Sequence, residues 1–326
     1  MIPKSYKTII QWVLAASCIL YLVRFFAKNT EGLKLVLDLN PLYVLGIALL
    51  VVLGHLIFAW RYRIILIKCS EKTLPFLPLA KMIILSRFLG VFAPQAGNIY
   101  RGVVLKKQHR ISYTTYASSF FSITWFDTCL NLIFALIIIL AIKPELELGG
   151  TRAWLGLLAL IILIGLIPFI TEQILRKIKV KNRYLLWVHG RLSEMFNVSV
   201  SAVSDKSYLV KMVLTGVISF VNTIIMFYIC FHALGISITL PVLSLFYVIL
   251  RLCNSIQITP GNIGIREIAY GILSSYMQIG MAEGILVSVA MRIISLVVIS
   301  VMGIALGGVA IIKNKESLDL ETNPQV

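Results

Sequence analysis

Two short stretches interrupt the apolar pattern of this chain in a similar way: residues 94–101 read PQAGNIYR, and residues 260–267 read PGNIGIRE. Each stretch begins with proline, continues through Gly-Asn and includes an arginine near its end. A further arginine precedes each stretch, at Arg87 and at Arg251. Because proline ends helices and glycine permits tight turns, both stretches predict a broken helix within an otherwise apolar segment.

The composition places these broken helices in a membrane protein. Of the 326 residues, 59% are hydrophobic and only 13% are charged, and the mean hydropathy is +0.93. Soluble domains contain about 25% charged residues, so most of this surface must face lipid. The apolar content also excludes a disordered chain. The net charge of +16 does not indicate a nucleic acid partner, because no long soluble stretch is available to present it.

Cysteine and histidine give no sign of a metal or redox site. The five cysteines are scattered through apolar runs without a CxxC pair, and the four histidines have no metal-ligand spacing. No lipase, zinc-protease or Walker motif occurs either. We therefore expect no metal, no cofactor and no enzymatic activity.

Apolar runs of about 20 residues predict membrane-spanning helices. Six such runs occur, near residues 8–26, 41–60, 117–142, 153–171, 209–232 and 284–311. Two further stretches, about 79–97 and 239–280, are apolar but contain the two interruptions. These two stretches do not have the pattern of plain spans.

The distribution of Lys and Arg predicts the orientation, because basic loops remain on the cytoplasmic side. The start of the chain, its tail and the connections 61–81, 101–110 and 172–208 are all basic. The first interrupted stretch would then begin and end at the cytoplasmic face, and the second at the outer face. We expect two re-entrant hairpins that enter from opposite sides of the cytoplasmic (inner) membrane, with both termini cytoplasmic.

The predicted fold is an all-α integral membrane protein with six full transmembrane helices and two oppositely oriented re-entrant helical hairpins. Two spans, a hairpin and a span occur twice, which gives an inverted 4+4 repeat with halves at about 8–142 and 153–312. Residues 1–312 would form one domain, with an amphipathic cytoplasmic loop at 172–208 and a short polar cytoplasmic tail at 313–326. Eight ordinary spans with kinks are the alternative.

Charged side chains at membrane depth are the candidate site, because each costs about 2.5–3.5 kcal/mol at a helix centre. The residues expected to bind a lipid head group are Arg87, Asn98, Arg101, Arg251, Asn262, Arg266 and Arg292. Asp127 and Glu267 would balance part of their charge. Four of these arginines, all except Arg101, are expected at membrane depth, where the two acids leave an excess of two positive charges. Guanidinium groups bind phosphate or carboxylate through paired hydrogen bonds. An anionic ligand is therefore expected.

The re-entrant turns are expected at Pro94, Gly97, Pro260, Gly261 and Gly264. A helix that restarts after such a turn directs unpaired N–H groups and the positive end of its dipole into the membrane. The same prolines and glycines would also be explained if they only ended helices or allowed close packing. Each arginine–acid pair would likewise be explained by a structural role alone.

The pattern R-x6-P-x2-GN-x2-R from Arg87 to Arg101, together with PGNIGIRE from Pro260 to Glu267, resembles the lysylphosphatidylglycerol synthase transmembrane-region family, also called the flippase-like domain. The resemblance covers nearly the whole chain, from about residue 8 to 312. It implies lipid translocation or lipid handling. In longer members this region precedes a soluble aminoacyltransferase domain, which is not expected here because only about fifteen residues follow the last predicted span.

We expect this chain to flip or handle an anionic phospholipid or a lipid-linked glycan through a central, arginine-lined cavity. Two other functions stay open: an ion-coupled transporter of a small anionic solute, and a non-catalytic membrane subunit that positions a separate lipid-modifying transferase. The partners would be the lipid and the membrane, and a homodimer or a partner transferase is left open.

The inverted topology is tested by single cysteines placed within 98–110 or within 258–268 of a variant that lacks the five native cysteines. A membrane-impermeant maleimide should label the first segment from the cytoplasmic side and the second from the outer side, because the hairpins enter from opposite faces. Labelling of both segments from one side would contradict the inverted repeat.

Overall fold

The computed structural model describes residues 24, 34, 38–70, 72–92, 95–177, 190, 205–254, 262 and 264–308. Within these residues the chain is almost entirely helical, apart from a short hairpin of β1 (Glu147–Leu148) and β2 (Thr151–Arg152). Several predicted features lie outside the described residues: the span at 8–26, most of the loop at 172–208, the tail at 313–326, and Pro94, Pro260 and Gly261.

Five helices of the described residues are long and apolar enough to cross a membrane. They are α3 (Pro41–Ser70), α6 (Tyr113–Ile142), α7 (Ala153–Lys177), α9 (Lys206–Ala233) and α12 (Met281–Ala305). Each coincides with one of the predicted spans. The largest difference in bounds is at α3, which continues ten residues past its predicted end at residue 60.

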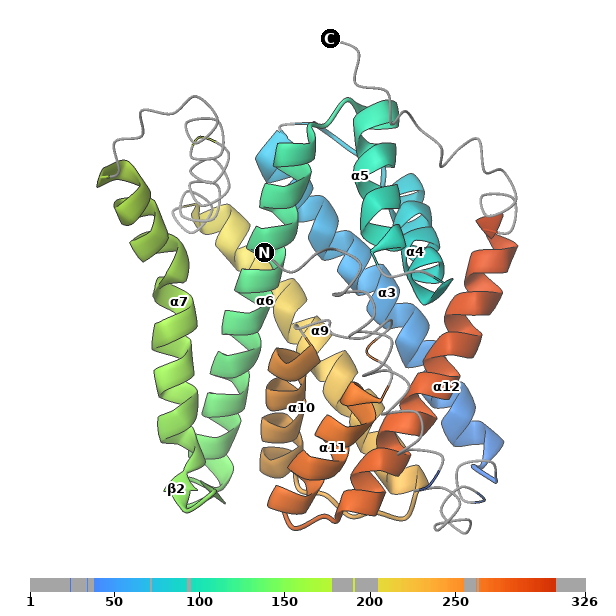
Figure 1. The fold of residues 1–326 in the computed structure, drawn as a ribbon, viewed down its shortest axis with the longest axis vertical. Coiled ribbons are helices and arrows are strands. Elements are labelled where there is room, and N and C mark those ends of the chain that lie inside the picture. Colours follow the sequence, from blue (N-terminus) through green and yellow to red (C-terminus); the bar gives the residue numbers. More distant parts are fainter. Residues whose placement is uncertain are drawn as a thin grey trace.

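Shorter helices occupy the two interrupted stretches. They are α4 (Phe76–Phe92), α5 (Ala96–His109), α10 (Leu240–Asn254) and α11 (Ile265–Tyr276). In Figure 1, α4 and α5 pack together in the upper half of the bundle, and α10 and α11 pack together in the lower half. The helices therefore end just before the first Gly-Asn motif and around the second, and one short pair lies toward each end of the bundle.

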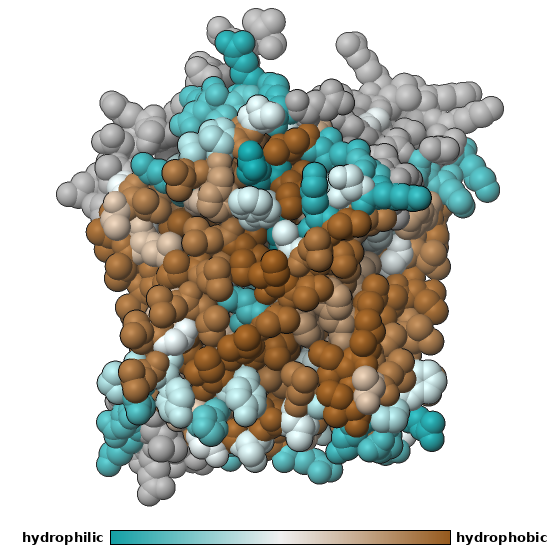
Figure 2. Space-filling view, turned by 180° about the vertical axis from the view of Figure 1, so that it is seen from behind, coloured by the Kyte–Doolittle hydropathy of each residue, from teal (hydrophilic) through white to brown (hydrophobic). Residues whose placement is uncertain are grey.

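The surface of the bundle is hydrophobic around its middle. Figure 2 shows a broad hydrophobic belt with hydrophilic residues gathered at both ends, and one hydrophilic patch interrupts the belt on this face. Large apolar side chains are exposed along the helices, such as Leu163 at 66% and Leu49 at 62%. An apolar surface of this extent would be unstable in water, and helices satisfy their backbone groups internally in lipid. The chain is a multi-pass membrane protein.

Helices α3 and α9 form the centre of the bundle. They run diagonally through it and pack against each other (Figure 1), and Asn222 of α9 donates a hydrogen bond to the Leu50 carbonyl oxygen of α3 at 3.1 Å. One cluster of buried apolar side chains joins both helices to α10, α11 and α12, and another joins them to α4 and α5. The two short pairs therefore pack onto the same central helices, with α6 in contact with both.

The first short pair depends on a close approach at Gly97. This residue lies in the first turn of α5, and its carbonyl oxygen accepts a hydrogen bond from Ser86 Oγ of α4 at 2.8 Å. A Cβ atom at Gly97 would overlap the Ser86 backbone oxygen. Gly97 thus lies after the break, inside the new helix, where it allows α5 to contact the α4 backbone.

We expect Gly97→Ala to destabilise the protein by about 1–3 kcal/mol, because the added methyl group forces the α4 and α5 backbones apart. Thermal unfolding in detergent measures the effect as a lower Tm. Gly90→Ala on α4 is the matched control, since a Cβ there meets nothing within 4 Å. Equal Tm values for the two variants would show that the close contact at Gly97 is unimportant.

Candidate functional site

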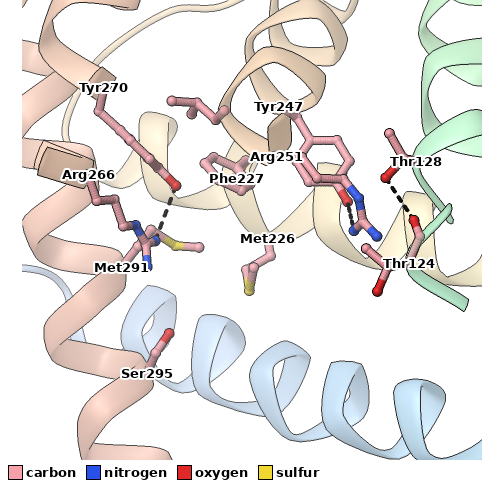
Figure 3. A pocket seen from close by; sticks show the side chains of 11 residues that line it. Thr124, Thr128, Met226, Phe227, Tyr247, Arg251, Arg266, Tyr270, Met291 and Ser295 are labelled. Atoms are coloured by element: carbon pink, nitrogen blue, oxygen red, sulfur yellow. Dashed lines mark hydrogen bonds between the residues drawn. The ribbon is translucent and has the colours of Figure 1, made fainter. Parts of the chain in front are cut away.

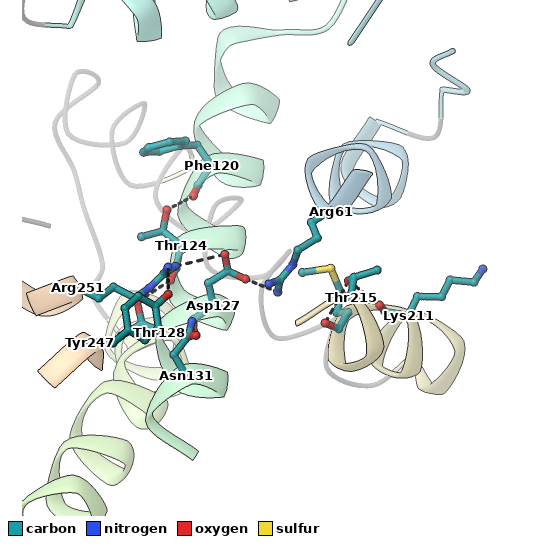
Figure 4. A network of polar contacts seen from close by, with 11 residues as sticks. Arg61, Phe120, Thr124, Asp127, Thr128, Asn131, Lys211, Thr215, Tyr247 and Arg251 are labelled. Carbon is teal, nitrogen blue, oxygen red and sulfur yellow. Dashed lines mark hydrogen bonds and ion pairs between the residues drawn. The ribbon is translucent and has the colours of Figure 1, made fainter. Parts of the chain in front are cut away.

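A carboxylate midway along α6 pairs with arginines from two other helices (Figure 4). Asp127 Oδ1 forms an ion pair with Arg61 Nη2 of α3, and Asp127 Oδ2 lies 3.3 Å from Arg251 Nη2 of α10. Arg61 is 1% exposed and Asp127 is 5% exposed. Arg61 Nε has no hydrogen-bond partner among the described residues. One buried negative charge therefore serves two guanidinium groups, which leaves this trio with a charge of +1.

The sequence-based assignment of Arg61 to the cytoplasmic connection 61–81 is wrong. Because α3 continues to Ser70, Arg61 lies inside a membrane-length helix and is buried against α6. Residues 64–67 read IILI, and this apolar run after Arg61 and Arg63 was the signal that the helix continues.

Arg251 and Arg266 face one cavity, of about 290 Å³, among α6, α9, α10, α11 and α12 (Figure 3). Each arginine bonds to a tyrosine four residues away on its own helix. Arg251 Nη1 donates to the Tyr247 hydroxyl at 3.2 Å, and Arg266 Nη2 donates to the Tyr270 hydroxyl at 3.1 Å. The second broken helix therefore presents an arginine and a tyrosine from each side of its break to the same space.

The remaining wall of this cavity is partly polar. Thr124 and Thr128 of α6 and Ser295 of α12 add hydroxyl groups, while Met226, Phe227, Leu250 and Met291 supply its apolar part (Figure 3). The Arg266 guanidinium also lies over the Tyr270 ring, 5.2 Å from its centroid. Arg266 Nε has no hydrogen-bond partner among the described residues.

Arg292 and Glu267 hold the second break in place. Arg292 Nε donates to Glu267 Oε1 at 2.6 Å, and Arg292 Nη2 donates to the Asn262 carbonyl oxygen at 3.2 Å. The other carboxylate oxygen of Glu267 accepts from the Gly264 backbone N–H at 2.8 Å. Gly264 has a φ of 81°, a conformation that favours glycine at the turn into α11. Arg292 therefore ties α12 to the broken segment through its charge.

The first motif brings Asn98 and Arg101 together on α5. Arg101 is 5% exposed, and its Nη2 donates to Asn98 Oδ1. Arg101 Nε and Nη1 have no hydrogen-bond partner among the described residues, although the guanidinium lies 5.3 Å from the centroid of the Phe120 ring. Arg101 thus keeps buried donors that no described neighbour uses.

Arg87 of α4 connects the two motifs electrostatically. Its guanidinium lies 5.2 Å from the centroid of the Phe58 ring, and the side chain is exposed. Its positive charge interacts with that of Arg101 and with that of Arg251. The structure therefore brings arginines of the first motif near an arginine that lines the cavity beside the second.

The positive charge around the broken helices exceeds the sequence-based expectation. The six arginines near the broken helices are Arg61, Arg87, Arg101, Arg251, Arg266 and Arg292. Asp127 and Glu267 are the carboxylates paired with them among the described residues. Burial of Arg61 and Arg101 raises the excess of arginines over acids from two to four.

Arg61, Tyr247 and Tyr270 are functional candidates that the sequence did not identify. For the tyrosines, the available indication was their spacing from an arginine, Y-x3-R and R-x3-Y.

This arrangement suits anion binding. Guanidinium groups and tyrosine hydroxyls complement a phosphate diester or a carboxylate. Groups of three or more metal-binding side chains do not occur in the part of the chain that the structure describes.

Replacing Asp127 with asparagine should destabilise the protein by about 3–5 kcal/mol, because Arg61 would keep a buried charge without a counter-ion. The measurement is Tm in detergent, with Glu145→Gln as control because Glu145 is an exposed acid. Adding Arg61→Met to Asp127→Asn should recover part of the loss. If Asp127→Asn and Glu145→Gln have the same Tm, the trio is not a stabilising element.

Residues 8–303 match the protein family described as lysylphosphatidylglycerol synthase TM region. No match was found among curated proteins or among solved structures. The family match covers both broken helices, all the arginines described above and both paired acids, and it confirms the family that the two motifs indicate. The chain therefore belongs to the lysylphosphatidylglycerol synthase transmembrane-region family.

Proposed function

We propose that this protein moves an anionic phospholipid or a lipid-linked glycan between the leaflets of the cytoplasmic membrane. The observation that carries the proposal is that Arg251 and Arg266 face one cavity from the two sides of a broken helix. Membrane location and a lipid-associated family support it. The cargo would bind through its phosphate, and its acyl chains would remain in the bilayer.

The excess positive charge explains why the cargo would be anionic. Arg61 and Arg251 share Asp127, and Arg292 is paired with Glu267, while the remaining arginines form no ion pair with an acid among the described residues. A phosphate diester would offset part of that charge and accept hydrogen bonds from Arg251, Arg266 and the tyrosine hydroxyls. These bonds would replace water that a head group loses when it enters the membrane.

The cavity walls also support entry from the side of the bundle. Thr124 of α6 lines the cavity and is exposed, whereas Thr128, one turn farther along α6, is buried. We therefore place the entrance of the cavity beside Thr124. A head group could enter there while the acyl chains stay against the apolar belt.

In this proposal, the α4–α5 and α10–α11 pairs are re-entrant hairpins from opposite leaflets, and residues 8–26 supply the sixth span of an inverted 4+4 repeat. Their positions in opposite halves of Figure 1 support this topology. Broken helices that meet near the bilayer midplane form the substrate sites of many transporters. The basic connections would place both termini in the cytoplasm.

The proposed role involves no covalent step. The lipid would leave the protein as it entered, so aminoacyl transfer and other lipid modification are left to separate enzymes. Arg87, Asn98 and Arg101 would receive the head group in the first half, and Arg251 and Arg266 in the second. Asn262 and Arg292 would shape the second turn.

Reconstituted protein should scramble fluorescent phosphatidylglycerol faster than protein-free vesicles do, as measured by dithionite quenching. Arg266→Ala should slow this movement about tenfold or more, because a charge-assisted hydrogen bond contributes about 1.5–3 kcal/mol. Arg266→Lys keeps the charge without the planar fork and should lie between wild type and Arg266→Ala.

Lys107→Ala is the matched control, because Lys107 is exposed on α5 and does not line the cavity. Equal rates with and without protein would overturn the proposal. Substrate-dependent current from a small anion without lipid movement would instead identify a solute transporter.

A further inference from the structure

A second cavity lies between the last turns of α3 and the first turns of α9. It has a volume of about 460 Å³ and shares no lining residue with the arginine-lined cavity. One face of α3, from Trp60 to Lys68, and one face of α9, from Ser207 to Thr215, form its walls. The lining positions recur three, four, seven and eight residues apart, so each wall is a single helix face. We refer to this cavity as the α3–α9 groove.

The α3–α9 groove carries charges at the end of the bundle and along its middle, and it is mainly apolar beyond them. Lys68 lies in the last turn of α3, and Asp205 caps the start of α9, so both mark the end of the bundle. Arg63 and Lys211 lie farther along the two helices, and Trp60 and Leu214 follow one turn beyond them. This order matches a phospholipid whose phosphate lies among the charges and whose acyl chain follows the apolar wall.

The charges of the groove favour an anion. Three of its side chains are cationic, namely Arg63, Lys68 and Lys211, and one is acidic, Asp205. Lys68 Nζ donates to Asp205 Oδ2 at 2.6 Å, and Arg63 Nε donates to the Leu74 carbonyl oxygen at 2.5 Å. The hydrogen bond from Lys68 lowers the pKa of Asp205, so this carboxylate is charged at neutral pH. Asp205 thus offsets one of three positive charges.

We propose that the α3–α9 groove binds an anionic phospholipid of the adjacent leaflet as a resident ligand that is not transported. Charge complementarity selects the head group, since a phosphate would meet Lys211, which is exposed, and the guanidinium of Arg63. The apolar wall at Trp60 and Leu214 selects a lipid over a free anion. The proposal does not depend on lipid translocation, because the two cavities are built from different residues.

Asp205 would limit the affinity of this site. Its Oδ1 accepts the Tyr208 backbone N–H at 3.1 Å as the N-cap of α9, while its Oδ2 holds Lys68. Asparagine is an equally good N-cap but carries no charge. Asp205→Asn would therefore preserve the helix start and release Lys68 for the lipid phosphate. Lys211→Gln would remove a cation from the same groove, so the two substitutions should have opposite effects.

The test uses Trp60, which lines the groove, as the reporter. The full chain is reconstituted in phosphatidylcholine vesicles with increasing fractions of phosphatidylglycerol brominated on its acyl chains, and tryptophan quenching is measured. Quenching that disappears in Trp60→Phe is assigned to the groove. The reverse mixture, brominated phosphatidylcholine in unbrominated phosphatidylglycerol, is measured for comparison. We expect quenching to reach half-saturation at a lower mole fraction of the brominated lipid when that lipid is phosphatidylglycerol.

Lys211→Gln should raise the half-saturating fraction of brominated phosphatidylglycerol about fivefold, the effect of about 1 kcal/mol per basic residue near an anionic surface. Asp205→Asn should lower it. Lys206→Gln is the matched control, because Lys206 is an exposed lysine next to Asp205 that does not line the groove. It should leave the value unchanged.

Equal half-saturation for the two brominated lipids would overturn the proposal, as would equal effects of Lys206→Gln and Lys211→Gln. Millimolar inorganic phosphate should leave the quenching unchanged; loss of the preference for phosphatidylglycerol would identify a free-anion site and also overturn it. Arg266→Ala should retain wild-type quenching, so failure of lipid translocation and failure of this site are distinguishable.

Discussion

A buried carboxylate on α6 holds guanidinium groups from helices that are far apart in the sequence. Asp127 pairs with Arg61 of α3 and with Arg251 of α10, which lies 124 positions away along the chain. A buried charge is costly unless it is paired, so none of these helices can shift without exposing a charge to lipid or to apolar side chains. The relative positions of α3, α6 and the second broken helix depend on this carboxylate, which two arginines share.

The other acid determines which arginines remain available to a ligand. Glu267 uses one oxygen for Arg292 and the other for the Gly264 backbone N–H, so it fixes the turn and neutralises a neighbour of Arg266. Arg266 then projects into the cavity beside Tyr270. Arginines without acidic partners are costly in lipid. Under the proposed function, a bound phosphate would offset part of that cost.

Much of the fold follows from local sequence. The lengths of the apolar runs predict the positions of α6, α7, α9 and α12, and the two Pro-to-Arg motifs predict where helices break. The end of α3 was predicted too early because Arg61 and Arg63 have the composition of a loop. Only the packing of α3 against α6 shows that Arg61 is an interior residue. Tyr247 is uncharged, so composition alone did not mark it as a site residue.

The sequence by itself determined that most of the surface faces lipid. It also determined the long apolar helices, the two helix breaks and the excess of positive charge. Each of these properties depends on the transfer free energy or backbone preference of contiguous residues. The tertiary structure alone decided which arginine meets which acid, which arginines face a cavity, and that α3 and α9 form a second, basic groove. Such pairings join residues from different helices, so they depend on how the helices pack and not on local composition.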